Sequence, residues 1–227
     1  SKTKLFVTQV NFIGYVINEQ GWTTDPNKIK AILTLQPPKD VHELKSILGA
    51  TSYYRKFCPS YSKTVTPLFK LLKKGAKFNF DDECKAAFHS LIDLFKSPLV
   101  LRPFQINQPV YLATDSSYTS IASILYQWCP QTKKFFIVDT AGRSLKNQEK
   151  AYTVLEIEIL SVIHALEAFK SYLTLQTELH LLTDHMSTQS YKNIKQTTAG
   201  GRVARWAQKL SQFSIIVHHV KGKSHHL

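Results

Sequence analysis

The 227-residue sequence has few cysteines and no long hydrophobic run. Cys58, Cys84 and Cys129 are odd in number, far apart and free of any CxxC pair. This pattern argues against a disulfide framework or a thiolate zinc site and favours free thiols in a reducing compartment. No stretch of about 18 apolar residues is present, and the first residues lack the apolar core of a signal peptide. We therefore expect an intracellular protein, or a fragment of a longer chain, that has no membrane partner.

Acidic residues are scarce relative to basic ones. The chain has 29 Lys and Arg against 16 Asp and Glu, which gives a formal net charge of +13. A basic surface of this kind predicts a polyanion such as nucleic acid as the partner. Charge alone identifies no ligand, so a merely soluble basic protein stays an alternative at this point.

The longest helical pattern is YTVLEIEILSVIHALEAFKSYL at 152–173. At roughly 100° per residue, Glu158 falls on the packed side of its apolar stripe, whereas Glu156 falls further round on the other side. A carboxylate on the packed side needs a cation, either a basic side chain or a metal ion, unless it reaches water at the rim of the stripe. The stripe recurs at spacings of four and three residues and consists of Leu155, Ile159, Val162, Leu166, Phe169 and Leu173.

Two predicted strands run into a Thr-Asp pair. One ends at Asp115 and the other at Asp184. If the strands are parallel neighbours packed against the long helix, Asp115, Glu158 and Asp184 converge at one edge of the sheet. Three carboxylates predict a Mg²⁺ site, because Mg²⁺ is a hard cation that prefers oxygen ligands. Either Thr-Asp pair by itself is equally consistent with an ordinary turn after a strand.

The first half of the sequence predicts a hairpin-like pair of strands that turns at Gly21, followed by a small basic helical unit. Three helix starts carry local signals: Asp25 before a proline, Asp40 in a capping box, and Asp81 in NFDD as an N-terminal cap. Prolines at 98 and 103 bracket a linker. The strands are expected at 4–10 and 12–18, and the helices at 26–36, 41–57, 63–74 and 82–96.

The second half predicts the element order βββαβαβ, an antiparallel meander extended by parallel strands. The expected fold class is therefore α+β and α/β: a helical unit followed by a domain with a mixed sheet and flanking helices, which is the layout of the RNase H fold. The strands are expected at 110–114, 121–127, 135–139, 179–183 and 213–220.

Six segments resemble, in chain order, the C-terminal part of a gypsy-type LTR-retrotransposon reverse transcriptase. VNFIGYVI (10–17) resembles its primer grip, and 26–57 is similar to its thumb and the start of its connection. Four segments are similar to its RNase H domain: ATDSSYTSIASILYQ (113–127), RSLKNQEKAYTVLEIEILSVIHALEAFKSYL (143–173), LLTDHMS (181–187) and GRVARWAQKLSQFSI (201–215).

The resemblance implies three regions: the end of the palm with the primer-grip hairpin at 1–24, a helical thumb and connection at 25–103, and an RNase H-like domain at 104–227, truncated at its C-terminus. It implies an RNase H-type endoribonuclease within an RNA-directed DNA polymerase polyprotein, without the polymerase YxDD aspartates. Two Mg²⁺ ions, or Mn²⁺ in their place, would activate water and stabilise the leaving oxygen, and 2′-hydroxyl contacts would select RNA.

Site residues follow from the same resemblance. The implied partners are an RNA/DNA hybrid or other nucleic acid and the rest of the polyprotein, in the cytoplasm, a virus-like particle or the nucleus. The catalytic metal ligands would be Asp115, Glu158 and Asp184. The nucleic-acid-binding residues at the primer end would be Phe12, Ile13, Gly14 and Tyr15. Four basic residues are further nucleic-acid-binding candidates on their own chemistry, independent of the resemblance: Arg55, Lys56, Arg202 and Arg205.

The sequence departs from the family at two places. Ser120 and Ala122 stand where glycine is common, and a fourth ligand, an Asp after a KGK-type turn, would come after Leu227, so we expect weak cleavage by residues 1–227. The alternative function is a non-catalytic nucleic-acid-binding remnant of a decayed or domesticated element, which lack of Mg²⁺-dependent hybrid cleavage would indicate.

Three further residue groups have alternatives. Tyr53 and Tyr54, beside two basic residues, suit either a nucleic-acid groove or helix packing. Trp206 is expected in the core with the neighbouring arginines at its rim, although these arginines could also contact phosphates. Zinc is disfavoured for the C-terminal histidines because no Cys or carboxylate lies at ligand spacing; these are His218, His219, His225 and His226.

Overall fold

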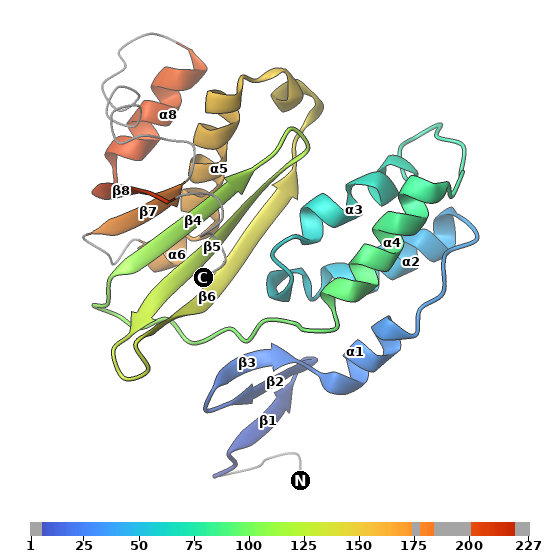
Figure 1. Ribbon diagram of the computed structural model, residues 1–227, viewed down its shortest axis with the longest axis horizontal. Helices are drawn as coiled ribbons and strands as arrows, with labels where there is room; N and C mark the ends of the chain where they lie inside the picture. The colour runs from blue at the N-terminus through green and yellow to red at the C-terminus, as the bar shows by residue number, and fades with distance from the viewer. Residues whose placement is uncertain (1–5, 174–177, 184–200, 221–227) are drawn as a thin grey trace. The chain divides into compact units, whose positions relative to one another are not determined.

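The computed structural model describes residues 6–173, 178–183 and 201–220. The chain divides into two compact units, Ser1–Pro103 and Phe104–Leu227. The first unit contains a three-stranded antiparallel sheet and helices, and the second a mixed five-stranded sheet with flanking helices (Figure 1). The predicted fold class is confirmed.

The small sheet of the first unit differs from the predicted pair of strands. Its chain order is β1 (Gln9–Phe12), β2 (Tyr15–Asn18) and β3 (Gly21–Thr24), all antiparallel. The predicted turn is present at residues 19–20, directly before Gly21, but a further turn at residues 13–14 separates β1 from β2, and Gly21 begins a third strand that was not predicted. A Cβ on Gly21 would lie 2.1 Å from the carbonyl oxygen of Leu101, so glycine is needed here for close backbone approach, which gives the same sequence signal as a turn.

Aspartates begin three of the helices in the first unit, as predicted. The side chains of Asp25, Asp40 and Asp81 accept hydrogen bonds of 2.8, 2.8 and 2.9 Å from backbone N–H groups of the first turn. Leu44, Phe88 and other apolar side chains are buried between the helices. The helices are α1 (Pro26–Leu33), α2 (Val41–Ser52), the 3₁₀ helix η1 (Arg55–Phe57), α3 (Tyr61–Lys70) and α4 (Asp82–Leu94).

The predicted helix at 41–57 is too long. It ends at Ser52, and two tyrosines then lead into the separate turn of η1. The hydroxyls of Tyr53 and Tyr54 donate to carbonyl oxygens of the β1–β2 turn. These long-range bonds, which the local sequence cannot show, accompany the end of the helix.

The sheet of the second unit has the strand order β6-β5-β4-β7-β8 (Figure 1). β4 pairs antiparallel with β5, and β5 with β6, whereas β7 runs parallel to both β4 and β8. This is the predicted meander extended by parallel strands. The strands are β4 (Val110–Ser116), β5 (Ser120–Cys129), β6 (Lys134–Ser144), β7 (Leu179–Thr183) and β8 (Ile215–His219).

The long helix is shorter and more deeply buried than predicted. It begins after the cap residue Thr153 as α5 (Val154–Ala168), and Phe169 separates it from α6 (Lys170–Leu173). Because α5 packs against β4 and β5 and also against α8 (Arg202–Ser211), most of its surface is covered rather than one stripe. Leu155, expected in the stripe, is instead 46% exposed in the first turn.

Two other expectations concern the described part of the chain as a whole. Cys58, Cys84 and Cys129 form no disulfide in the part of the chain that the structure describes, and all three are buried. Within the described residues, no helix combines the length and the apolar character needed to cross a membrane.

Candidate active site and nucleic-acid interface

Glu158 lies on the buried side of α5, as helical geometry predicts. Its residue is only 4% exposed, and its Oε1 accepts a hydrogen bond of 2.7 Å from the hydroxyl of Ser116. Ser116 is the last residue of β4. The bond therefore ties the carboxylate of the helix to the end of the central strand.

Asp115 precedes Ser116 in β4 and is exposed. The strand continues through Asp115 instead of ending before it, and Asp115 pairs with Ala122 of β5. The structure thus places Asp115 one residue from a group that contacts Glu158. Successive side chains of a strand point to opposite faces, so the Ser116–Glu158 bond brings the backbone of Asp115, and not its carboxylate, near Glu158.

The third predicted ligand, Asp184, lies outside the described residues. β7 ends just before it, at the fully buried Thr183, and pairs in parallel with β4 through Ala113 and Leu182. Among the residues that the structure describes, no three His, Cys, Asp or Glu side chains gather as a metal site. The parallel neighbours that the prediction required are present, and the joint position of the three carboxylates stays a prediction.

The donor chemistry at the end of β4 suits a hard cation. The groups that meet there are carboxylate and hydroxyl oxygens, which Mg²⁺ and Mn²⁺ accept as ligands and which thiolate-preferring metals disfavour. A buried carboxylate is costly without positive charge or donors, and Ser116 supplies one donor to Glu158. The residues present therefore fit a divalent cation.

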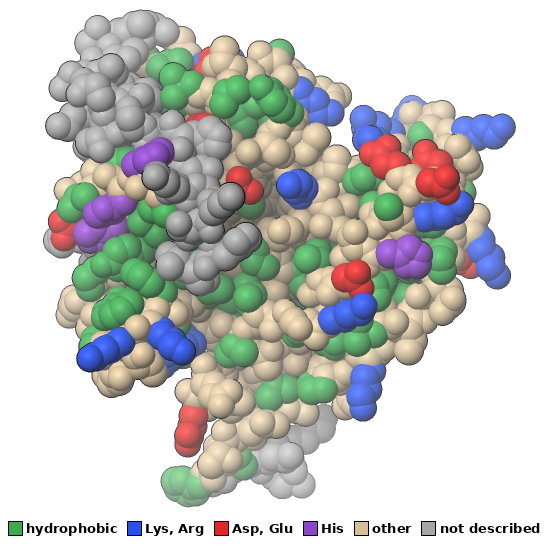
Figure 2. All heavy atoms as spheres, viewed as in Figure 1, with side chains coloured by type: hydrophobic (Ala, Val, Ile, Leu, Met, Phe, Trp, Pro, Cys, Tyr) green, Lys and Arg blue, Asp and Glu red, His purple; other side chains and the backbone are tan. Residues whose placement is uncertain are grey.

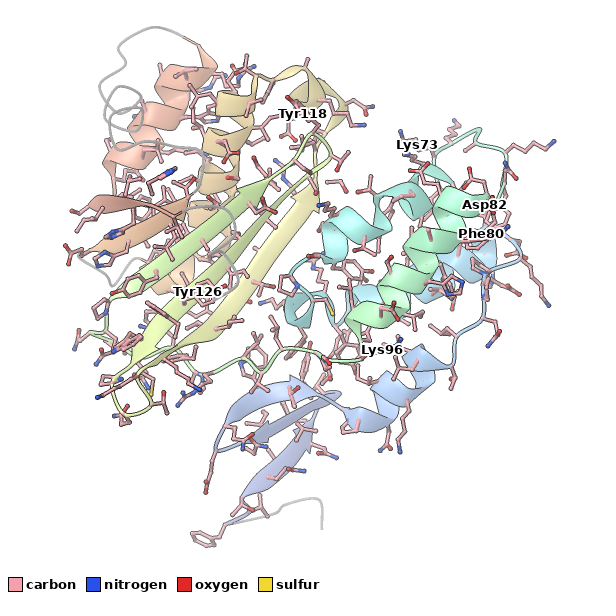
Figure 3. All side chains as sticks on the ribbon, viewed as in Figure 1. Lys73, Phe80, Asp82, Lys96, Tyr118 and Tyr126 are labelled. Atoms are coloured by element: carbon pink, nitrogen blue, oxygen red, sulfur yellow. The ribbon has the colours of Figure 1, made fainter. Side chains whose placement is uncertain are left out.

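The turn between β4 and β5 carries a hydroxyl network next to Asp115. Ser117 Oγ accepts from the Ser120 N–H at 3.1 Å, and the two serine hydroxyls lie 3.2 Å apart. Tyr118, which is 66% exposed, lies at the tip of this turn (Figure 3). Ser120 therefore stabilises the turn at a position where the resemblance led us to expect glycine, and Ala122 places a Cβ opposite Asp115.

A partly buried ion pair supports the segment that leads into α5. Both guanidinium nitrogens of Arg143 donate to Glu149, at 2.6 and 2.8 Å, and the Lys146 N–H donates at 2.7 Å. Burial alone would raise the pKa of Glu149, but Arg143 and the Lys146 N–H outweigh it, so this pKa lies below its ordinary value. The pair fixes the 3₁₀ helix η2 (Asn147–Ala151) ahead of α5.

Glu156 has surroundings unlike those of Glu158. It forms a capping box with Thr153 and an ion pair with Arg202. The Thr153 backbone N–H and the Arg202 guanidinium lower the pKa of Glu156. The guanidinium of Arg202 also lies 3.8 Å from the centre of the Tyr152 ring. Arg202 thus already has partners within the domain.

The remaining predicted contacts with nucleic acid lie on exposed surface. Arg205 on α8 and both Arg55 and Lys56 on η1 are exposed. Trp206 is 8% exposed and belongs to the core, as predicted. Lys and Arg side chains are scattered, among acidic ones, over the face of the protein shown in Figure 2.

The predicted primer-end residues form the end of β1, the turn, and the start of β2. Phe12 and Ile13 are 57% and 67% exposed, which leaves their side chains open to a partner. Gly14 has φ +77°, in the region that only glycine adopts readily. Tyr53, Tyr54 and Tyr15 pack beside the turn. Sequence reasoning identified the tyrosines, but not that they contact the turn.

Two histidines pair at the edge of the second sheet. His180 Nδ1 and His218 Nε2 are 2.8 Å apart, and His180 stacks on Tyr111 with ring centres 4.6 Å apart. The pKa of His180 lies below its ordinary value, chiefly because the ring is partly buried and also because His218 lies next to it. The sequence drew attention to His218 but not to this pair; His225 and His226 lie outside the described residues.

Comparison with known proteins agrees with this architecture. Residues 80–180 match the family described as "RNase H-like domain found in reverse transcriptase". The Tf2-3 and Tf2-4 transposon polyproteins of Schizosaccharomyces pombe are each 29% identical over 228 aligned residues, which cover 100% of this chain and 17% of each polyprotein. The chain therefore spans about a sixth of the length of these relatives.

Solved structures show the same fold. The foamy viral protease-reverse transcriptase in complex with an RNA/DNA hybrid has a TM-score of 0.77 at 20% identity, covering 97% of this chain and 30% of that one. A structure in complex with double-stranded DNA has a TM-score of 0.75 at 18% identity, covering 94% and 38%. The predicted resemblance is therefore confirmed: residues 80–180 are similar to the RNase H-like domain found in reverse transcriptases, and the whole chain is similar to part of retrotransposon polyproteins.

Proposed function

We propose that the chain is part of a retroelement reverse transcriptase and that its second unit hydrolyses the RNA strand of RNA/DNA hybrids. One observation carries the proposal: within an RNase H-like sheet, Ser116 at the end of β4 donates to the buried Glu158 of α5. This contact brings the chain segment of Asp115 to Glu158. The related structure with an RNA/DNA hybrid supports a hybrid as the substrate.

Asp115, Glu158 and Asp184 would hold Mg²⁺, with Mn²⁺ as a substitute. When bound, the ion would supply positive charge that activates water and offsets the charge on the leaving oxygen. The chain contributes a buried, hydrogen-bonded carboxylate whose position is fixed, and an exposed one that a nucleic-acid strand can approach. The turn at residues 12–15 would bind the primer end, and the net charge of +13 would add salt-dependent attraction for nucleic acid.

The test is cleavage of an RNA/DNA hybrid with a labelled RNA strand in the presence of Mg²⁺. The parent should cut the RNA strand and lose activity with EDTA, and Asp115→Asn should abolish cleavage. The same variant should keep its fold and its affinity for the hybrid, since removing an exposed carboxylate creates no cavity. Equal cleavage by parent and Asp115→Asn would show that the assigned site is wrong.

The net charge of +13 also supports a second candidate, a nucleic-acid-binding remnant without catalysis. Salt-dependent binding of hybrid, with no Mg²⁺-dependent cleavage at any tested Mg²⁺ or Mn²⁺ concentration, would favour this candidate over the nuclease.

A further inference from the structure

The turn between β1 and β2 adopts a conformation that its own sequence disfavours. Ile13 has φ +47° and Gly14 has φ +77°. Two positive φ angles allow a tight hairpin turn, but a β-branched residue such as isoleucine adopts this region with difficulty. The turn therefore needs support from elsewhere in the unit.

Two adjacent tyrosines after α2 provide that support. The hydroxyl of Tyr53 donates to the carbonyl oxygen of Ile13, and the hydroxyl of Tyr54 donates to that of Gly14 at 3.1 Å. The backbone N–H of Asp25 donates to the same Gly14 oxygen at 3.1 Å. Both carbonyls of the turn are thus held by side chains 40 residues away in the chain.

Ring packing fixes the tyrosines themselves. Tyr15 stacks on Tyr53, with ring centres 5.3 Å apart and planes 15° apart, and meets Tyr54 edge to face at 5.9 Å. Burial, followed by the nearby Tyr53, raises the pKa of Tyr54, so its hydroxyl keeps its proton at neutral pH and can donate. A Cβ on Gly14 would lie 2.9 Å from the Tyr54 hydroxyl oxygen, so this contact requires glycine.

A pocket beside the turn has the same residues in its wall. Its volume is about 450 Å³, within the range of pockets that bind small organic groups. Ile13, Gly14, Tyr53 and Tyr54 line it together with apolar residues of α1 and α2, and Lys28 adds a positive charge. The apolar walls offer packing surface to an organic group, and the Lys28 ammonium attracts an anion. Any shift of the turn would change the shape of this pocket.

We propose that Tyr53 and Tyr54 are positioning residues that hold the 13–14 turn in the form that binds the 3′ end of a nucleic-acid strand. Their role is to make the turn and the end of α2 one rigid element. The inference rests on the proposed binding of a primer end by residues 12–15, and it adds the two side chains that make this binding possible.

The test compares Tyr53→Phe, Tyr54→Phe and the double variant with the parent, because each change removes only a hydroxyl. Tyr61→Phe is the matched control: its hydroxyl lies 3.0 Å from Thr51 Oγ1 in the core of the same unit. Fluorescence anisotropy would measure affinity for a duplex with a recessed 3′ end and for a dumbbell duplex without strand ends. Hydrogen exchange would measure protection of the Asp25 amide, and thermal unfolding would monitor the fold.

We expect the parent to prefer the recessed end, and the double variant to lose about tenfold in affinity for it while binding the dumbbell unchanged. The Asp25 amide should exchange about tenfold faster in the double variant and at the parental rate in Tyr61→Phe. Tyr53 is 45% exposed, so Tyr53→Phe keeps the core and tests the role even if Tyr54→Phe unfolds.

Two negative results would overturn different claims. A parent that binds dumbbell and recessed end equally would overturn the primer-end role of the turn, and the inference with it. A parent that prefers the recessed end, with phenylalanine variants that show the same preference and the same exchange rate, would overturn this inference alone.

Discussion

Ser116 donates a hydrogen bond of 2.7 Å to Glu158, a residue 42 positions further along the chain. The bond connects the end of β4 with the buried side of α5, two elements that the sequence identifies separately. A carboxylate that is 4% exposed is stable only with donors or positive charge nearby. The Ser116 hydroxyl is one such donor, and the position of a cation at the end of β4 stays a prediction.

Glu158→Gln should reduce hybrid cleavage far more than Glu156→Gln. Glu158 is turned toward the end of β4, whereas Glu156 interacts with Thr153 and Arg202. Glu156→Gln should instead lower the free energy of unfolding, by about 1 kcal/mol, since it weakens a capping box and an ion pair. Initial cleavage rates and denaturant unfolding of both variants would check this.

Cleavage rate and unfolding free energy together distinguish a residue that acts at the site from one that stabilises the start of α5. A variant that loses activity at unchanged stability acts at the site, and one that loses stability at unchanged activity acts on the helix start. Equal activity losses, or a larger loss for Glu156→Gln, would contradict the assignment of Glu158.

Ser116→Ala should raise the Mg²⁺ concentration needed for half-maximal cleavage by about tenfold. Groups that orient a metal ligand typically contribute 10- to 100-fold to metal affinity, and Ser116 orients Oε1 of Glu158. Mn²⁺ binding followed by electron paramagnetic resonance should weaken in parallel, without any need for turnover. Ser116→Thr keeps a hydroxyl, so its Mg²⁺ requirement and its affinity for Mn²⁺ should stay close to those of the parent.

Ser161→Ala is the matched control for Ser116→Ala. Its hydroxyl also bonds to Glu158 at 2.7 Å, but to the main-chain oxygen. If both serine variants weaken Mn²⁺ binding equally, the effect comes from packing around α5 rather than from orientation of the carboxylate.

Local chemistry explains why the helix starts were predictable. The side chains of Asp25, Asp40 and Asp81 act within three residues of themselves, so the sequence contains the complete signal. The turn before Gly21 was predictable, but the approach of Leu101 to this glycine was not, because Leu101 is 80 residues away in the chain. In the second unit, the number of strands and their pairing followed from the alternation of strand and helix patterns.

The candidate site was predictable only in part. Helical geometry correctly placed Glu158, rather than Glu156, on the buried side of α5, because the direction of a side chain on a helix depends on its position alone. The partners of Arg202 were not predictable, since Tyr152 and Glu156 meet it only when α8 packs on α5. The His180–His218 pair likewise depends on the parallel pairing of β7 with β8.

Gly49→Ala should stabilise the first unit by about 0.5–1 kcal/mol. Gly49 lies inside α2, and a Cβ there would meet no atom within 4 Å. Alanine in place of glycine lowers the conformational entropy of the unfolded chain without a steric cost. The free energy of unfolding from urea titration would measure the gain.

Gly21→Ala should have the opposite effect. Its φ of +130° and the 2.1 Å approach to the Leu101 oxygen leave no room for a Cβ. A stabilising Gly21→Ala, or a destabilising Gly49→Ala, would show that the backbone positions in the first unit differ from those described.

Glu149→Gln should destabilise the second unit by roughly 2–3 kcal/mol at pH 7, the magnitude of hydrogen bonds to a charged group. Glu149 is 7% exposed and accepts three charge-assisted or backbone hydrogen bonds from Arg143 and Lys146. The neutral amide cannot accept the paired donors of the guanidinium in the same way. Glu167→Gln is the control, because the Glu167–Lys209 pair is half-exposed and should contribute little.

The pH dependence of the difference in unfolding free energy between the parent and Glu149→Gln gives the sharper test. The folded-state pKa of Glu149 lies below its ordinary value of 4.5, so the unfolded state binds the proton more readily. The stabilisation is therefore complete above the unfolded pKa and is lost as pH falls through the folded one. Parent and Glu149→Gln should differ most in stability near neutral pH and converge below about pH 4.5. A difference that stays constant from pH 7 to pH 3 would mean that the charge of Glu149 contributes nothing and that only its shape matters.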